Sequence, residues 1–269
     1  MDNETLKKLQ SVETGILAVF DEFCRKHGLK YSLFAGTALG AVRHGGFIPW
    51  DDDIDVCMER SEYERFLELW EEEGNQDDYF LYATDDPGYR YINHSKLRKY
   101  GTMLATEWEY KTFKCNGIWL DIFPIDKVPT DKKKRKKYLR KNKFRMIYTR
   151  GYPLKGRGFV YYLITKLLLL KSLRMQFKKR NKLDEYIKST KDLTSGFEYM
   201  CLASMADLAI KYPPNLFDEY IDIDFEGHKF SIVKDYHTML TNEFGDYMQL
   251  PPEEERVCKH NPKYVRFDS

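Results

Sequence analysis

The sequence predicts an α+β fold in two parts, with a small mixed sheet in residues 1–129 and a helical, basic region in residues 130–269 that completes the fold. Short apolar runs typical of strands alternate with helical patterns as far as Pro129, and helical spacing dominates beyond it. The chain is 42% apolar and 15% aromatic, which suffices for a buried core and excludes a disordered chain. Residues 127–182 hold 21 Lys and Arg against one acid, Asp131, whereas the rest of the chain is acidic.

The first part is expected to open with a helix, because Leu6, Leu9 and Ile16 recur at helical spacing before Gly28. A later helix is expected to begin at the capping box of Ser61 and Glu64. In chain order the expected elements are a helix at 4–27, a strand at 30–34, a helix at 36–44, a strand at 53–58, a helix at 61–72 and strands at 79–83, 91–97 and 117–123.

The second part is expected to be mainly helical, with the turn residues Glu226-Gly227 marking one hairpin. In chain order the expected elements are basic helices at 131–150 and 158–182, alternating helix and turn over 184–211, hairpin strands at 220–225 and 228–233, and a helix near 235–244.

The cysteines and the termini indicate the compartment. Five cysteines, an odd number without a CxxC pair, argue against a disulfide framework and favour a reducing environment. Cys258 and His260 have no second pair of residues at zinc-ligand spacing. The N-terminus has no secretory signal, and no window reaches the roughly 20 apolar residues that span a bilayer. We therefore expect a cytoplasmic protein, with peripheral contact at the inner face of the cell membrane allowed.

Three acids in apolar surroundings predict a metal site. Asp53 and Asp55 are two apart on an expected strand, so both carboxylates leave one face while Ile54 enters the core. Asp121 lies in the apolar segment Ile118–Phe123, where an acid without a partner is costly. If the two strands are neighbours, the three carboxylates form one site. Oxygen ligands of this kind select Mg²⁺ or Mn²⁺.

A phosphate-binding turn is expected beside this site. Gly36 and Thr37 stand where a strand passes into a helix, and the free N–H groups of a helix start favour a phosphate. Gly36 permits close approach of the backbone, and Thr37 is expected to cap the helix and to bond a phosphate oxygen. Each feature also has a plainer interpretation: a solvated acidic turn, an Asp121 that caps the turn before Pro124, and an ordinary helix N-cap.

These parts together resemble a nucleotidyltransferase core of the polymerase-β type, which carries Gly-Ser/Thr at a helix start, then Asp-x-Asp, then a later Asp. The stretch AGTALGAVRHGGFIPWDDDIDV more closely resembles the signature of the LicD family of phosphocholine transferases, with the fukutin-type transferases as more distant relatives. The segments Lys96-x-Arg98, Trp119–Pro124 and Gly245-Asp246-Tyr247 with the following Pro251-Pro252 and Arg256 are similar to that family as well.

The resemblance implies transfer of phosphocholine from CDP-choline to a hydroxyl of a cell-surface glycan precursor of the teichoic acid or lipopolysaccharide type. It implies Asp53, Asp55 and Asp121 as ligands of Mg²⁺ or Mn²⁺, with CMP as the leaving group. One of these acids or His44 would take the acceptor proton, and the plainer interpretation of His44 is a loop residue that shapes the site. The residues implied to hold the substrate are Gly36, Thr37, Arg43, Trp50, Lys96 and Arg98.

Two details of this assignment have alternatives. Lys96 and Arg98 leave one strand face and suit diphosphate oxygens, or they are surface charges on an edge strand. Trp50, Trp108 or Trp119 is expected to face the choline ammonium by a cation–π contact, with Trp119 equally fit for the core.

Rival functions also remain at this point. The same fold could transfer another polyol phosphate or a nucleotidyl group, or the chain could be a non-catalytic module that binds lipid or nucleic acid. The intact set of acids argues against the last. Apolar residues between the bases of 158–182 favour an anionic membrane surface, where Lys166, Lys171, Arg174 and Lys178 would share one side of a helix, and no nucleic acid is expected. A core helix with a basic, solvated face fits equally well.

Overall fold

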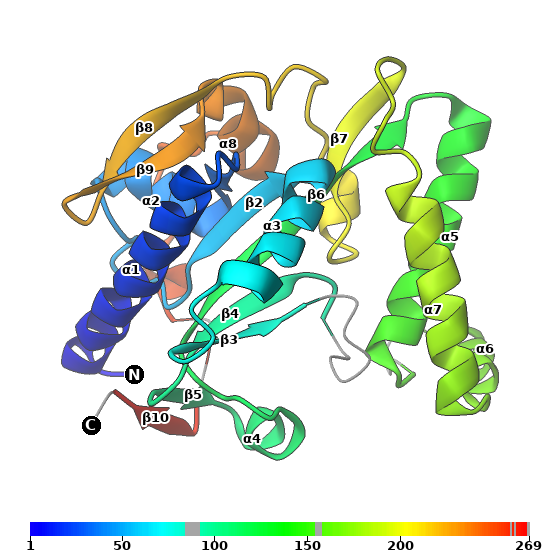
Figure 1. Ribbon diagram of the computed structural model, residues 1–269, viewed down its shortest axis with the longest axis horizontal. Coiled ribbons are helices and arrows are strands. Elements are labelled where there is room, and N and C mark those ends of the chain that lie inside the picture. The colour runs from blue at the N-terminus through cyan, green and yellow to red at the C-terminus, as the bar shows by residue number, and fades with distance from the viewer. Residues whose placement is uncertain (84–91, 154–157, 259, 261, 268–269) are drawn as a thin grey trace. The chain divides into compact units, whose positions relative to one another are not determined.

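The computed structural model describes residues 1–83, 92–153, 158–258, 260 and 262–267 (Figure 1). The chain forms two compact units. Unit 1 comprises residues 1–82, 95–123 and 215–269, and unit 2 comprises residues 83–94 and 124–214. Residues 215–269 were expected in the second part of the chain. In the structure they belong to unit 1, because their strands and helix contact the N-terminal elements.

Unit 1 is built around one sheet, with the strand order β1-β2-β6-β4-β3. The strands are β1 (Ser32–Leu33), β2 (Asp55–Glu59), β3 (Tyr79–Tyr82), β4 (Ser95–Lys99) and β6 (Trp119–Pro129), of which β6 runs on into unit 2. The pairs β1·β2, β3·β4 and β4·β6 are antiparallel. The expected α+β arrangement with one small sheet is therefore confirmed. The strand expected at 91–97 begins later, at Ser95, and Tyr91 lies outside the described residues.

Two helices pack their apolar sides on each other beside this sheet, α1 (Asn3–Lys26) and α3 (Arg60–Glu73) (Figure 1). The Asp2 side chain accepts the Thr5 N–H at 2.8 Å and caps α1. Phe20 and Phe66 are fully buried, with ring centroids 5.1 Å apart. Helix α3 contacts β2, and Val56, Cys57 and Met58 of that strand are fully buried.

Among the C-terminal elements of unit 1, β8 (Tyr220–Phe225) and α8 (Tyr236–Phe244) contact helix α2 (Ala35–His44), and β9 (His228–Val233) contacts β1. The hairpin of β8 and β9 forms as predicted, and Glu226 and Gly227 take the positive φ values that such a tight turn requires. The Ser32 hydroxyl accepts the Val233 N–H at 3.0 Å and so fixes β1 to β9. Helix α8 also forms as predicted.

Three short elements of unit 1 were not expected from the sequence. Strand β5 (Met103–Ala105) pairs with β10 (Tyr264–Arg266) in an antiparallel ladder. Helix α4 (Glu107–Thr112) begins at a capping box in which Thr106 and Glu109 bond each other's backbone N–H groups. A partner 159 or more residues away in the chain creates the β5·β10 ladder, so no local pattern signals it.

Unit 2 contains the basic helices. The helix expected at 131–150 is α5 (Lys132–Arg150), capped by the Asp131 side chain. The helix expected at 158–182 is wrong as a single element, because the chain breaks into α6 (Phe159–Leu169) and α7 (Leu173–Lys188). The Gln176 amide donates to the carbonyls of Leu169 and Lys171 and so satisfies groups that a continuous helix would pair internally.

Strand β7 (Phe197–Cys201) occupies part of the segment expected to alternate helix and turn. It pairs antiparallel with residues 125–129 of β6. Two short 3-10 helices are also present, η1 (Asp207–Ala209) in unit 2 and η2 (Glu253–Glu255) in unit 1. Among the described residues, no helix combines the length and the apolar character needed to cross a bilayer.

Candidate active site

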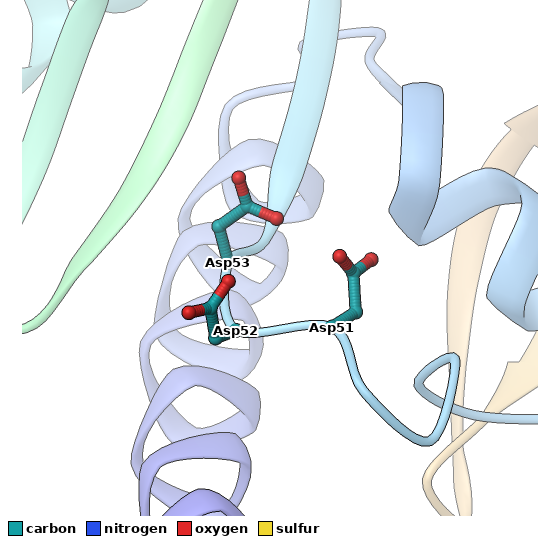
Figure 2. Close-up of side chains that lie close together, drawn as sticks. All are labelled: Asp51, Asp52 and Asp53. Atoms are coloured by element: carbon teal, nitrogen blue, oxygen red, sulfur yellow. The ribbon is translucent and has the colours of Figure 1, made fainter. Parts of the chain in front are cut away.

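The acidic turn before β2 is the centre of the candidate site. Asp51, Asp52 and Asp53 each place a carboxylate oxygen within 4.8 Å of the other two (Figure 2). Ile54 is fully buried, whereas Asp53 and Asp55 on the other side of the backbone keep partial exposure. The alternation therefore has the predicted consequence, since the core anchors Ile54 while both neighbouring carboxylates leave the opposite face.

Asp121 lies beside this turn, because β6 is the neighbour of β2. Its N–H donates to the Ile54 carbonyl at 3.0 Å. The Lys96 ammonium lies 2.7 Å from one Asp121 carboxylate oxygen and 2.8 Å from the other, and the Trp119 indole N–H donates to Oδ2 at 3.0 Å. A buried acid in an apolar strand thus has an ion-pair partner.

The electrostatics of the turn favour a cation. Burial raises the pKa of Asp55 well above its ordinary value, and the nearby carboxylates of Asp53 and Asp121 add to the effect. Burial also raises the pKa of Asp53, opposed by the charge of His260. Carboxylates that are desolvated together repel one another unless a cation lies among them. The oxygen donor set therefore fits a hard divalent ion such as Mg²⁺ or Mn²⁺.

Sequence analysis missed Glu13, a further acid near the acidic turn. Glu13 of α1 is fully buried, and neither carboxylate oxygen has a hydrogen-bond partner among the described residues. Burial raises its pKa well above the ordinary value, and the charges of Asp53 and Asp52 add to that. Leu9 and Ile16 continue the same helical stripe, so a charged residue at a core position of α1 was the signal that could have found it.

His260 is a second residue that the sequence did not predict for this site. Its ring Nδ1 lies 3.2 Å from Asp52 Oδ1 and 3.9 Å from Asp53 Oδ2. The backbone N–H of His260 donates to Asp52 Oδ2 at 3.1 Å. The hydrogen bond to Asp52 raises the pKa of His260. Because 208 residues separate His260 from Asp52, no local pattern could have signalled the contact.

A cavity of about 660 Å³ opens beside the acids within unit 1. One wall comes from α2 and the acidic turn, and the other comes from the segment after α8. The lining residues are Ala35, Gly36, Leu39, Arg43, Ile48, Trp50, Asp51, Asp53, Asp55, Phe244, Asp246, Tyr247, Gln249, Leu250, Pro251, Pro252 and Glu255. The predicted residues Gly36, Arg43, Trp50, Asp53 and Asp55 therefore share one cavity, and Asp121 lies next to it on β6.

The start of α2 is arranged differently from the expectation. The N-cap residue is Phe34, and the Thr37 hydroxyl, in a residue only 2% exposed, accepts the Asp55 N–H at 2.8 Å. Thr37 thus joins α2 to β2 and does not cap the helix. Gly36 does line the cavity, and a Cβ there would lie 2.6 Å from an Asp51 carboxylate oxygen. The glycine therefore makes room for the acidic turn.

Arg43 and His44 lie at the other end of α2. The Arg43 guanidinium donates to the Tyr247 carbonyl at 3.0 Å and to His44 Nε2 at 3.0 Å. Burial, together with the Arg43 charge, lowers the pKa of His44. Arg43 is in the cavity wall and His44 is absent from it. His44 is the last residue of α2, whereas the acids meet the start of that helix at Gly36 and Thr37, so the length of the helix separates this candidate base from them.

Lys96 and Arg98 share one face of β4, as predicted, but both are buried. Their charged groups lie 4.3 and 4.8 Å from the Trp119 ring centroid. Arg98 also donates to the Gly117 carbonyl at 2.9 Å, and neither residue lines the cavity. The edge-strand alternative is wrong, because β4 lies between β6 and β3. Arg98 is fully buried among aromatic rings, and these surroundings do not favour the expected contact with a diphosphate.

The three candidate tryptophans differ in position. Trp50 lines the cavity, with the Arg256 guanidinium 5.8 Å from its ring centroid. Trp119 is 3% exposed and belongs to the core, as the alternative interpretation held. Trp108 of α4 is 48% exposed and is not in the cavity wall. Trp50 is therefore the tryptophan of the three that a ligand in this cavity would meet.

Comparison with known proteins identifies the family to which this chain belongs. A model of the LicD/FKTN/FKRP nucleotidyltransferase domain matches residues 28–165, about half of the chain. A lipopolysaccharide cholinephosphotransferase LicD of Haemophilus influenzae is 32% identical over 265 residues, which cover 97% of each protein. The chain belongs to the LicD family. An uncharacterized protein of Rickettsia typhi is 42% identical over 76 residues, 28% of this chain and 21% of that protein.

LicD membership confirms the resemblance seen in the sequence and the expectation of a LicD-type transferase. The matched residues contain α2, the acidic turn and the strand that carries Asp121. The similarity to the Haemophilus influenzae LicD extends over the C-terminal segment that forms the second cavity wall as well.

Proposed function

We propose that this LicD-family enzyme transfers phosphocholine from CDP-choline to a hydroxyl of a cell-surface glycan precursor, of the lipopolysaccharide or teichoic acid type. The observation that carries the proposal is the pair Asp53 and Asp55, which open onto a cavity beside Asp121 and the start of α2. The full-length similarity to a lipopolysaccharide cholinephosphotransferase supports the same donor group and acceptor class.

In this proposal Asp53 and Asp55 hold Mg²⁺ or Mn²⁺, with Asp121 as the third acid of the set. A metal bound by these residues would supply positive charge that neutralises the donor diphosphate and the leaving CMP. Lys96 holds both oxygens of Asp121 and so fixes the orientation of that carboxylate. The first N–H groups of α2, next to Gly36, face no acceptor within the helix and suit a phosphate oxygen.

The proposed reaction forms one P–O bond, breaks one P–O bond and moves one proton. The acceptor hydroxyl oxygen attacks the phosphorus that carries choline, and the bond from that phosphorus to CMP breaks. The hydroxyl proton passes to a carboxylate of the acidic turn, since His44 is not in the cavity wall. Trp50 offers its ring to the choline ammonium, and Asp246 and Glu255 add negative charge to the same cavity. We propose that the reaction takes place in the cytoplasm.

The test is an assay with CDP-choline, Mg²⁺ and a lipopolysaccharide acceptor, which measures CMP release and choline incorporation. Asp53→Asn and Asp55→Asn are expected to reduce the rate by about 10³-fold or more, because each removes a carboxylate that would hold the metal. Asp224→Asn on the exposed hairpin is the matched control and should retain the rate.

Other outcomes of this assay separate the rival functions. Release of a nucleotide from a different donor, without CMP release from CDP-choline, would favour a same-fold transferase of another polyol phosphate or nucleotidyl group. Mn²⁺ binding measured by calorimetry should fall in Asp53→Asn. Unchanged Mn²⁺ binding together with no turnover of any donor would favour a non-catalytic module.

A further inference from the structure

Helix α6 turns its apolar side outward. Five residues at positions i, i+1, i+4, i+5 and i+8 occupy one face, which we call the α6 face: Phe159, Val160, Leu163, Ile164 and Leu167, between 40% and 74% exposed. The opposite side carries Thr165, which is 1% exposed and donates to the Tyr161 carbonyl at 2.9 Å. The apolar stripe of a helix in a soluble protein normally faces the core, whereas the apolar stripe of α6 faces solvent.

The exposed apolar surface continues beyond the helix. Leu170 at the C-cap of α6 is 71% exposed, and Leu173 and Met175 at the start of α7 are 57% and 49% exposed. Single exposed apolar residues are common, but a run of eight over two neighbouring elements marks an interaction surface.

Basic groups border this surface. Lys166 is exposed at the edge of the α6 face, and Arg174 and Lys178 are exposed on the first turns of α7. The Lys179 ammonium lies close enough to Lys171 to lower its pKa. The sequence places one acid, Asp131, among residues 127–182. The potential around the apolar surface is therefore strongly positive.

We propose that the α6 face and the adjacent start of α7 insert into the surface of an anionic lipid bilayer. A peripheral helix of this kind buries its apolar side at the level of the acyl boundary, with lysine and arginine at the anionic headgroups. The charge selects this occupant, because a second copy of the chain would bring like charges together. A nucleic acid would neutralise the bases but would leave the leucines in water.

Sedimentation with lipid vesicles tests the proposal in the absence of any nucleotide. The full chain should bind vesicles of phosphatidylcholine and phosphatidylglycerol, and binding should weaken at least tenfold on pure phosphatidylcholine and on addition of salt. The double variant Leu163→Gln/Leu167→Gln should bind the anionic vesicles more than tenfold less tightly. Lys166→Ala and Lys178→Ala should each weaken binding about fivefold.

Ile221→Gln is the matched control, since Ile221 is 38% exposed on β8 and belongs to unit 1. All substituted side chains are exposed, and circular dichroism checks that each variant keeps its helix content. Failure of the full chain to bind anionic vesicles at low salt would overturn the proposal. A dimer in analytical ultracentrifugation that the leucine variant abolishes would also overturn it. Because no donor or acceptor is present, neither result depends on the proposed function.

Discussion

Lys96 and Asp121 form a buried ion pair beside the acidic turn, with side chains only 7% and 8% exposed. Burial lowers the pKa of Lys96, and the charge of Asp121 opposes that effect. Two buried charges at this distance are maintained by each other, so the loss of one leaves the other without compensation. The pair also sets where the third carboxylate of the site points, which makes Lys96 a positioning residue.

Replacement of Lys96 by methionine is expected to lower the free energy of unfolding by about 3–5 kcal/mol, because the Asp121 carboxylate then lies buried without its partner. The double variant Lys96→Met/Asp121→Asn should recover a large part of that loss, since it buries no charge. Urea denaturation of the wild type, both single variants and the double variant measures the coupling between the two residues. Additive losses would show that the pair contributes nothing as a pair.

Helix α2 connects the fold to the chemistry. Its start lies beside the acidic turn, and its middle packs against the loop that leads to Trp50 and Asp51. A Cβ at Gly40 would lie 2.4 Å from the Gly46 carbonyl oxygen and 3.1 Å from the Ile48 nitrogen. Both neighbours are backbone atoms of that loop, so the glycine at this position allows a close approach between helix and loop.

Gly40→Ala is therefore expected to destabilise the protein by about 1–3 kcal/mol, because the loop backbone must move. Gly15→Ala on α1 is the matched control, since a Cβ there meets nothing within 4 Å. That change should stabilise the protein by about 0.5–1 kcal/mol through better helix propensity. Thermal unfolding of the two variants compares them directly, and equal shifts would contradict the close approach at Gly40.

At the scale of the whole molecule, the last residues of the chain return to unit 1. His260 contacts the acidic turn, and Lys263 and Tyr264 bind Glu107 of α4, with 2.9 Å between the Tyr264 hydroxyl and Glu107 Oε2. Lys111 lies 2.7 Å from the other Glu107 oxygen. Hydrogen bonds from these three partners lower the pKa of Glu107 to about 2.

A carboxyl whose pKa is lowered from 4.5 to about 2 on folding stabilises the protein above pH 4.5. That contribution is lost as the pH falls toward 2, because the Glu107 carboxyl is then protonated in the folded state as well as in the unfolded state. Glu107→Gln should therefore unfold at a lower temperature than the wild type at neutral pH, with the difference narrowing below pH 4.5. Glu72→Gln on α3 is the control. A difference that stays constant with pH would contradict the role of the carboxylate charge.

Sequence alone determined the features that depend on neighbouring residues. The α+β class, helices α1, α2 and α3, the β8–β9 hairpin and the opposite sides taken by Ile54 and its two neighbouring aspartates all follow from local spacing and turn residues. The strand expected at 53–58 begins only at Asp55. The LicD signature added the family, and the family was confirmed. These predictions succeed because apolar periodicity fixes which side of an element is buried before the element meets any partner.

Only the tertiary structure decided which of these residues meet. In the structure, the Thr37 hydroxyl joins α2 to β2 by a hydrogen bond, and His44 lies at the end of α2 away from the acids. Arg98 is buried among aromatic rings. The tertiary structure also brought Glu13 and His260 to the acidic turn, and it split the long basic helix so that the apolar side of α6 faces outward. Each of these outcomes depends on contacts between distant segments, and a one-dimensional pattern carries no information about such contacts.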